Sequence, residues 1–181
     1  HSKDSFGATS YLVKAHSVSD EDGESESFDG IMVDSPRYSS RLAKDIEAVL
    51  GGSPKFMFLT HKDDVSDHIK WKERFPSMKR IMHKLDVKSP SEWPYIEMRD
   101  VEVQLEGDGP WEVEGLERCG AKVVFTPGHS VGSSSLVLPQ TGRREGAVFT
   151  GDHLAFSGRL GRLDGFARFG DNLKVQAGSI E

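Results

Sequence analysis

Three short segments of this sequence share one arrangement, in which an apolar run is followed at once by a polar turn carrying histidine or aspartate. The segments are 58–64 (FLTHKDD), 125–130 (FTPGHS) and 149–153 (FTGDH). Apolar runs this short are typical of buried strands, and a rigid sheet can direct the side chains at its strand ends toward one point. We therefore predict that His61, His129 and Asp152 converge on a single site.

Imidazole and carboxylate groups, which these turns supply, form the ligand set of zinc, iron and manganese. The spacing therefore predicts a metal site, with His61, His129 and Asp152 as its main candidate ligands. Simpler interpretations remain open at this stage. A histidine such as His129 can be a hydrogen-bonded loop residue, and an aspartate such as Asp152 can stabilise a glycine-containing turn.

The motifs, taken in order, resemble those of the metallo-β-lactamase-fold hydrolases. Segment 126–133 (TPGHSVGS) is similar to the third motif of that superfamily and 149–152 (FTGD) to its fourth. Segment 31–36 (IMVDSP) resembles the first strand and turn, and 59–61 (LTH) the start of the second motif. The similarity extends over most of the chain. It implies an α/β fold, an αββα sandwich formed by one domain over 1–181, with a mono- or dinuclear metal site along one edge.

The second motif departs from the superfamily pattern His-x-His-x-Asp-His, because this chain reads HKDDVSDH over 61–68. An ungapped alignment puts Asp63 at the position of the second histidine, whereas a two-residue insertion restores the pair Asp67 and His68. A third possibility uses the helix that begins here, since Asp64 and His68 are four residues apart and share one face. Asp63 and His68 are thus additional candidate ligands, although Asp63 could instead cap the helix. We expect Asp64 and Asp67 to be solvated rather than ligating.

The resemblance implies hydrolysis. A divalent ion, with zinc as the first choice and iron or manganese as alternatives, lowers the pKa of bound water from 15.7 to about 7 and polarises a carbonyl or ester. A carboxylate that stays uncoordinated, Asp63 or Asp67, is the candidate catalytic base that accepts the proton of the attacking water. The substrate would be a small molecule with an ester, thioester, lactone or β-lactam bond. Glyoxalase II-like thioester hydrolysis is an expectation from the superfamily alone.

Two other functions stay open. Two histidines and one carboxylate also form the triad of non-haem Fe(II) oxygenases. Sulfur dioxygenases of the same superfamily use these three positions. Alternatively, the altered second motif has lost tight metal binding, and the chain is a non-catalytic interaction domain. Near the motifs, we expect Asp34 to fix a strand-to-loop turn, His153 to stand beside the ligands, and His83 to be structural.

Periodicity predicts the elements that must position these turns. Residues 40–50 form a helix, because apolar residues recur at helical spacing and a Gly-Gly pair follows. A second helix is expected at 65–75, and an antiparallel hairpin at 101–105, where apolar and polar residues alternate. The expected strands are short β-type runs, at 10–15, 30–34, 55–59, 80–83, 122–125, 135–138 and 147–149. The tail after Gly158 shows no clear period.

Composition excludes several classes of protein. The 181 residues carry a net charge of −6, which argues against nucleic acid as a partner because phosphate binding needs clustered Lys and Arg. No apolar run approaches the roughly 20 residues that cross a bilayer, so we expect a soluble protein without a membrane partner. The single cysteine, Cys119, excludes an intrachain disulfide framework and fits an intracellular, reducing compartment. The altered second motif resembles that of divergent plant and bacterial members of the superfamily, and a plastid location is compatible with that resemblance.

The end of the sequence is shorter than the superfamily pattern. That pattern continues after the fourth motif with a helix, a strand and a closing Gly-His turn, but no histidine follows His153 here. We therefore expect a fold that is incomplete at its C-terminus, with at most one well-occupied metal position. The uncovered sheet edge and apolar face could be covered by a second copy of the chain, as a homodimer.

Overall fold

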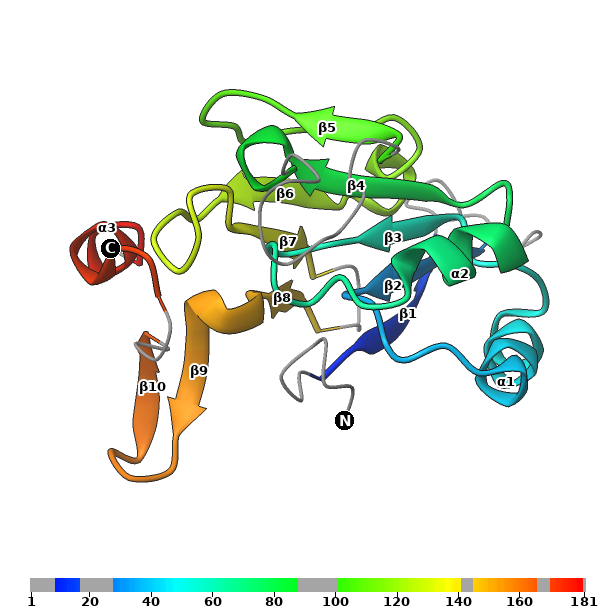
Figure 1. The fold of residues 1–181 in the computed structure, drawn as a ribbon, viewed down its shortest axis with the longest axis horizontal. Coiled ribbons are helices and arrows are strands. Elements are labelled where there is room, and N and C mark those ends of the chain that lie inside the picture. The colour runs from blue at the N-terminus through cyan, green and yellow to red at the C-terminus, as the bar shows by residue number, and fades with distance from the viewer. Residues whose placement is uncertain (1–8, 17–27, 88–100, 141–144, 166–169, 181) are drawn as a thin grey trace.

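The computed structural model describes residues 9–16, 28–87, 101–140, 145–165 and 170–180, and in them two β-sheets pack face to face (Figure 1). The larger sheet has the order β1 (Tyr11–His16), β2 (Phe28–Val33), β3 (Phe56–Phe58), β4 (Lys79–His83) and β5 (Val103–Leu105). The smaller sheet has the order β6 (Lys122–Phe125), β7 (Ser134–Leu138) and β8 (Ala147–Phe149). The strands predicted from the sequence are thereby confirmed within one or two residues.

Alternation along the central strands divides the core into two layers, because successive side chains of a strand point to opposite faces. Ile31, Val33 and the aromatic rings of β3 face the smaller sheet. The residues between them, Met32 and Met57, face the helices instead. Runs that are apolar on both faces are typical of strands buried between two layers, which is what the sequence pattern indicated.

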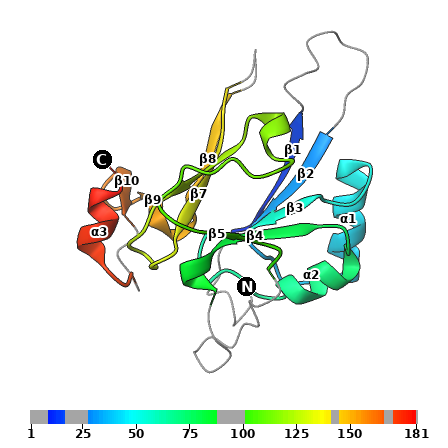
Figure 2. The same ribbon diagram turned by 90° about the horizontal axis from the view of Figure 1, so that it is seen from above.

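Helices α1 (Ser40–Leu50) and α2 (His68–Arg74) cover the outer face of the larger sheet (Figure 2). Helix α1 has the predicted bounds: the Ser39 hydroxyl accepts a hydrogen bond from the Leu42 N–H at 3.1 Å, and Gly51 ends the helix at φ 72°. Helix α2 begins three residues later than predicted, because Asp67 just before it has a left-handed conformation at φ 57°. The buried indole of Trp71 anchors α2 to the sheet.

Strand direction brings the predicted turns to one edge. Strands β2, β3, β4 and β5 are parallel, so the turns after β2, β3 and β4 leave the same edge of the larger sheet. The antiparallel hairpin expected at 101–105 is wrong, since β5 pairs in parallel with β4. Alternation indicates a strand with one polar face, but it does not indicate the direction of its partner.

The smaller sheet brings its own turns to the same place. Strands β6 and β8 both pair antiparallel with β7, so the turns that follow β6 and β8 leave the same end of this sheet. The Ser134 N–H at the start of β7 donates to the Thr60 carbonyl after β3 at 2.9 Å. This hydrogen bond joins the two sheets at the edge where the histidine-bearing turns meet.

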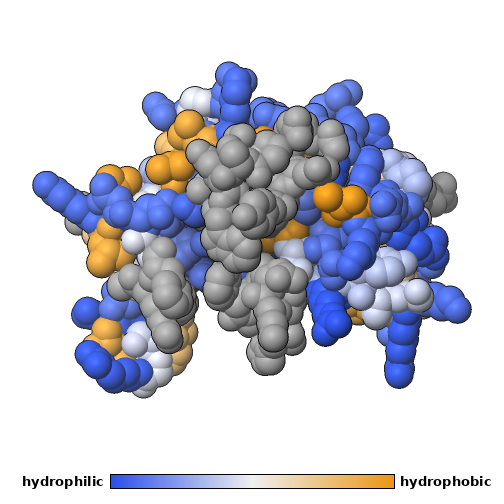
Figure 3. All heavy atoms as spheres, viewed as in Figure 1, coloured by the Kyte–Doolittle hydropathy of each residue, from blue (hydrophilic) through white to orange (hydrophobic). Residues whose placement is uncertain are grey.

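The tail without a clear period forms a hairpin of β9 (Leu154–Ser157) and β10 (Arg162–Gly165) and a short helix α3 (Leu173–Gly178). Figure 2 places α3 beyond the smaller sheet, on the side away from α1 and α2, so the order is helix, sheet, sheet, helix. Figure 3 shows apolar atoms at the lower left, over the hairpin, where Phe156 and Leu163 are exposed. The homodimer stays a prediction. Within the described residues, no helix is long and apolar enough to span a bilayer.

Candidate metal centre

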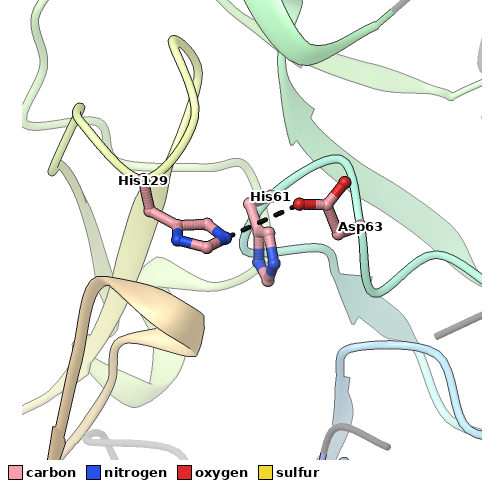
Figure 4. Close-up of side chains that lie close together, drawn as sticks. All are labelled: His61, Asp63 and His129. Carbon is pink, nitrogen blue, oxygen red and sulfur yellow. Dashed lines mark ion pairs between the residues drawn. The ribbon is translucent and has the colours of Figure 1, made fainter. Parts of the chain in front are cut away.

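The side chains of His61 and His129 face each other where the two sheets meet. Their ring centroids are 4.8 Å apart and their planes make an angle of 86°. Asp63 approaches from the turn after β3, and its Oδ2 lies 3.6 Å from His129 Nε2 (Figure 4). One ligand atom from each of the three residues lies within 4.8 Å of the others, so the three could hold one ion.

A second group overlaps with the first. It contains His61, Asp64 and Asp152, again with ligand atoms within 4.8 Å of one another. His61 Nε2 lies 3.8 Å from Asp64 Oδ2 and 3.9 Å from Asp152 Oδ2, and His129 Nε2 lies 3.7 Å from Asp152 Oδ2. The structure thus brings together His61, His129 and Asp152, as the spacing of the motifs predicted, and it places Asp63, one of the additional candidates, beside them.

The expectation that Asp64 is solvated was wrong. Its side chain is only 5% exposed and belongs to the second group. The turn from His61 to Asp67 brings Asp64 Oδ2 to 3.8 Å from His61 Nε2. The separation of three residues between His61 and Asp64 was the only sequence signal for this contact.

Asp34 and Thr60 set the orientation of the His61 ring. The Thr60 hydroxyl lies 2.9 Å from Asp34 Oδ1 and 2.8 Å from His61 Nδ1. Burial raises the pKa of Asp34 to about 7. When Asp34 is ionised, the hydroxyl hydrogen goes to the carboxylate, so His61 Nδ1–H donates to the Thr60 oxygen. Nε2 is then the unprotonated nitrogen and faces the cluster, which is the tautomer that a metal ligand needs. Asp34 fixes the turn, as expected from the sequence.

The pKa values of the clustered side chains indicate that a bound cation would stabilise the site. Burial, together with the nearby His129, lowers the pKa of His61 to about 3, so its imidazole is neutral. Burial raises the pKa of Asp64 to about 8, and repulsion from Asp34, Asp152 and Asp63 adds to it. Burial likewise raises the pKa of Asp152. The neutral imidazole of His61 among crowded carboxylates forms an environment that a divalent cation stabilises.

Asp86 is a buried residue that the sequence reasoning missed. Its carboxylate accepts hydrogen bonds from the Lys62 N–H at 3.0 Å, from the Gly132 N–H at 2.8 Å and from the Ser130 hydroxyl. Lys62 follows His61 and Ser130 follows His129, so one carboxylate ties the two histidine-bearing turns together. Burial raises the pKa of Asp86, although these hydrogen bonds oppose the change. Nothing in its local sequence distinguishes it from a surface aspartate.

Two predicted site residues lie elsewhere. Arg80 Nη1 lies 3.0 Å from His68 Nδ1, and His68 belongs to neither group of candidate ligands among the described residues. Burial, with help from Arg80, lowers the pKa of His68 to about 4. The Asp67 oxygens accept hydrogen bonds from the Tyr38 N–H at 2.9 Å and from Lys70 Nζ at 2.6 Å. The geometry therefore favours the ungapped alignment, and we no longer propose His68 as a ligand or Asp67 as a base.

The other histidines differ in their roles. His153 is buried beside Asp152, and burial lowers its pKa, with a further contribution from His129. His83 stacks on Phe125 with ring centroids 4.6 Å apart and lies 3.1 Å through Nε2 from the Gly107 carbonyl, which is the structural role expected of it.

Comparison with known proteins establishes the fold. No family model matches the chain, and no curated protein matches it. Among solved structures, TTHA1623, crystallised in a di-iron-bound form, is 22% identical over 96% of this chain and 79% of its own, with a TM-score of 0.60. The BLEG-1 B3 metallo-β-lactamase is 18% identical over 96% of this chain and 78% of its own, with a TM-score of 0.62. The chain has the metallo-β-lactamase fold.

A third solved structure is an N-acyl homoserine lactone hydrolase with its product, N-hexanoyl-L-homoserine, bound at the catalytic metal centre. It is 15% identical over 94% of this chain and 85% of its own, with a TM-score of 0.58. The metallo-β-lactamase fold thus accounts for the way in which three separate turns meet at one edge of the sandwich. At these identities the likeness concerns the fold.

Proposed function

We propose that this chain is a metal-dependent hydrolase that cleaves an ester, thioester, lactone or similar bond. The observation that carries the proposal is the convergence of two buried histidines and three aspartates from three separate turns, within reach of one another. Hydrolases on the same fold, a β-lactamase and a lactone hydrolase, support this reaction class.

The residues present fit a divalent ion. His61 Nε2 is buried without a hydrogen-bond partner, although buried polar atoms are normally paired. The aspartates around it would be costly to bury together as anions without a cation. His61, His129 and Asp152 would hold the ion, with Asp63 and Asp64 beside them. When bound, a divalent ion of this kind acidifies a water molecule and polarises a substrate carbonyl.

The side chains of this chain then have distinct tasks. The contact between His61 Nδ1 and the Thr60 hydroxyl, at 2.8 Å, keeps Nε2 turned to the site, and with Asp34 ionised it also leaves Nε2 unprotonated. Burial raises the pKa of Asp63, but His129, His61 and Lys62 outweigh burial and hold the pKa below its usual value. The Asp63 carboxylate is therefore ionised near neutral pH. We propose that it accepts the proton of the attacking water where it is not itself a ligand.

One observation favours a second candidate, a non-haem iron enzyme resembling the sulfur dioxygenases. The ungapped alignment replaces a histidine of the superfamily by Asp63, and the cluster is richer in carboxylate oxygen than in nitrogen. Harder oxygen ligands shift preference from zinc toward iron or manganese. The structural neighbour in a di-iron form is compatible with that preference.

Reconstitution separates the two functions. Metal-free protein is loaded with Zn²⁺ or, without oxygen, with Fe²⁺, and each form is assayed with 4-nitrophenyl acetate, nitrocefin and N-hexanoyl homoserine lactone, and for oxygen uptake with glutathione persulfide. We expect hydrolysis by a metal-loaded form that vanishes when a chelator is added. Oxygen uptake by the iron form without hydrolysis would establish the second candidate. Binding of neither metal would contradict both.

Changing Asp63 to histidine tests the ungapped alignment. Because Asp63 stands 3.6 Å from His129, an imidazole there should complete a nitrogen-rich site, and we expect zinc affinity to rise by roughly tenfold. Affinity is measured by competition with a chromophoric chelator. Asp45→His on α1 is the matched control, because the Asp45 side chain is 65% exposed and pairs with Arg41, so its replacement should leave zinc affinity unchanged. Weaker zinc binding by the Asp63 variant would reject the alignment.

A further inference from the structure

Residues 170–180, which follow the β9–β10 hairpin, contact every turn that carries a candidate ligand. Two backbone hydrogen bonds join this segment to the turn after β6, from the Asp171 N–H to the His129 carbonyl at 2.9 Å and from the Asn172 N–H to the Gly128 carbonyl at 2.8 Å. Figure 1 shows α3 beside the loop that joins β6 to β7. The peptide groups on both sides of His129 are therefore held by the C-terminal segment.

Gln176 connects the same segment to the turn after β8. It is the one buried residue of α3, at 2% exposed. Its Nε2 donates to the His153 carbonyl at 2.8 Å and lies 3.3 Å from the Asp152 carbonyl. These carbonyls belong to the two peptide groups that follow Asp152, so the amide fixes the backbone from which the Asp152 carboxylate extends. A polar side chain on the buried face of a six-residue helix is unexpected unless its hydrogen bonds are needed.

An ion pair joins the segment to the remaining turn. Lys62, which follows His61, places its Nζ 2.7 Å from Asp171 Oδ2. The Lys62 side chain is 16% exposed and that of Asp171 is 41% exposed, so solvent partly screens this pair. The three turns are thus contacted through Asp171 and Gln176, five residues apart.

Gly128 permits the close approach of α3. A Cβ added at Gly128, whose φ is 130°, would lie 2.2 Å from the Gln176 backbone nitrogen. No side chain fits in that space, and the backbone conformation also favours glycine. The glycine before His129 therefore does more than shape its own turn, because it lets the helix rest against the turn.

We infer that residues 170–179 position the three ligand-bearing turns, with Gln176 and Asp171 as positioning residues for the metal centre. This inference rests on the proposed metal-dependent function. Neither residue belongs to the two ligand groups, and each acts through a neighbour of a ligand. Without the Gln176 amide, the Asp152 and His153 carbonyls would lose their donor, and the turn would rearrange to regain one.

Cobalt binding tests the role of Gln176, because the visible absorption of bound Co²⁺ reports ligand geometry directly. Gln176→Met keeps a similar volume but removes the donor, and Lys174→Met on the exposed side of the same helix is the matched control. We expect Gln176→Met to bind Co²⁺ about 10- to 100-fold more weakly with an altered spectrum. The melting temperatures of the metal-free variants should agree within a few degrees. Unchanged affinity and spectrum in Gln176→Met would overturn the inference.

Asp171→Ala gives an independent test, since Asp171 is partly exposed and its loss should not prevent folding. We expect roughly threefold weaker Co²⁺ binding, from loss of the ion pair with Lys62. If Gln176→Met does not fold, unchanged affinity and spectrum in Asp171→Ala overturn the inference. Failure of the unaltered chain to bind Co²⁺ would instead contradict the proposed metal centre itself. The two hypotheses thus fail in different ways.

Discussion

Replacing His129 by alanine is expected to lower metal affinity by more than about 100-fold while the chain stays folded. His129 Nε2 lies 3.6 Å from Asp63 Oδ2 and 3.7 Å from Asp152 Oδ2, close enough for the three to share one ion. The turn that carries His129 follows the end of β6 and is not part of the apolar core. Metal content after gel filtration, together with circular dichroism, measures both quantities in one preparation.

The control for this variant is His83→Ala. His83 is also buried, but it stacks on Phe125 and faces the Gly107 carbonyl, away from the cluster. Replacing His83 by alanine should change the free energy of unfolding but leave the metal content per chain unchanged. A folded His129 variant that keeps the metal content of the unaltered chain would reject the site.

The second large effect concerns stability. Glu102 accepts two hydrogen bonds from the Arg80 guanidinium, at 3.1 Å from Nε and 3.0 Å from Nη2, and the Arg80 side chain is 3% exposed. Replacing Glu102 by glutamine removes the negative charge that faces the buried Arg80 guanidinium, so we expect a loss of about 2 kcal/mol in the free energy of unfolding near pH 7. The figure is below that for a fully buried pair because Glu102 is partly exposed.

The effect of Glu102 should depend on pH in a definite direction. Burial raises its pKa, but hydrogen bonds from Arg80 and Lys72 outweigh burial and lower the pKa from 4.5 to about 2. A depressed pKa contributes stability above the unfolded value, and that stability is lost as the pH falls through the folded value. The difference between wild type and Glu102→Gln should therefore be full above about pH 5 and shrink between 4.5 and 2.

Urea unfolding at a series of pH values measures this dependence. Glu114→Gln is the control, since Glu114 pairs with Lys79 at 3.5 Å while its own side chain is 92% exposed. That change should leave stability unaltered within error at every pH. A Glu102 variant as stable as the wild type at pH 7, or a difference that grows on acidification, would contradict the role given to the buried pair.

The sequence was most informative where local chemistry and spacing act together. Strand ends followed by histidine or aspartate predicted that His61, His129 and Asp152 converge, and helix α1 has the predicted bounds because Ser39 and Gly51 are strong local signals. Such features are set within a few residues of the chain. They can therefore be predicted from the sequence without knowledge of the tertiary contacts.

Features that depend on distant contacts were not predicted. The left-handed conformation of Asp67 shortens α2 and folds the preceding turn, which buries Asp64 and turns Asp67 and His68 away from the cluster. Asp86 and Gln176 hold turns that are far from them in sequence, by 24 to 46 residues for Asp86. Neither has a local pattern that marks it, since its partners are mostly backbone groups of other segments.

The metal content of the unaltered protein tests the central claim most directly. The chain is purified without chelators, passed through a metal-free column, and analysed by plasma mass spectrometry for zinc, iron and manganese per chain. A centre formed by His61, His129 and Asp152 with Asp63 and Asp64 predicts close to one bound transition-metal ion per chain, which a strong chelator removes and added metal restores. A folded protein that retains no transition metal, and takes up none when Zn²⁺ or Fe²⁺ is supplied, would contradict the account.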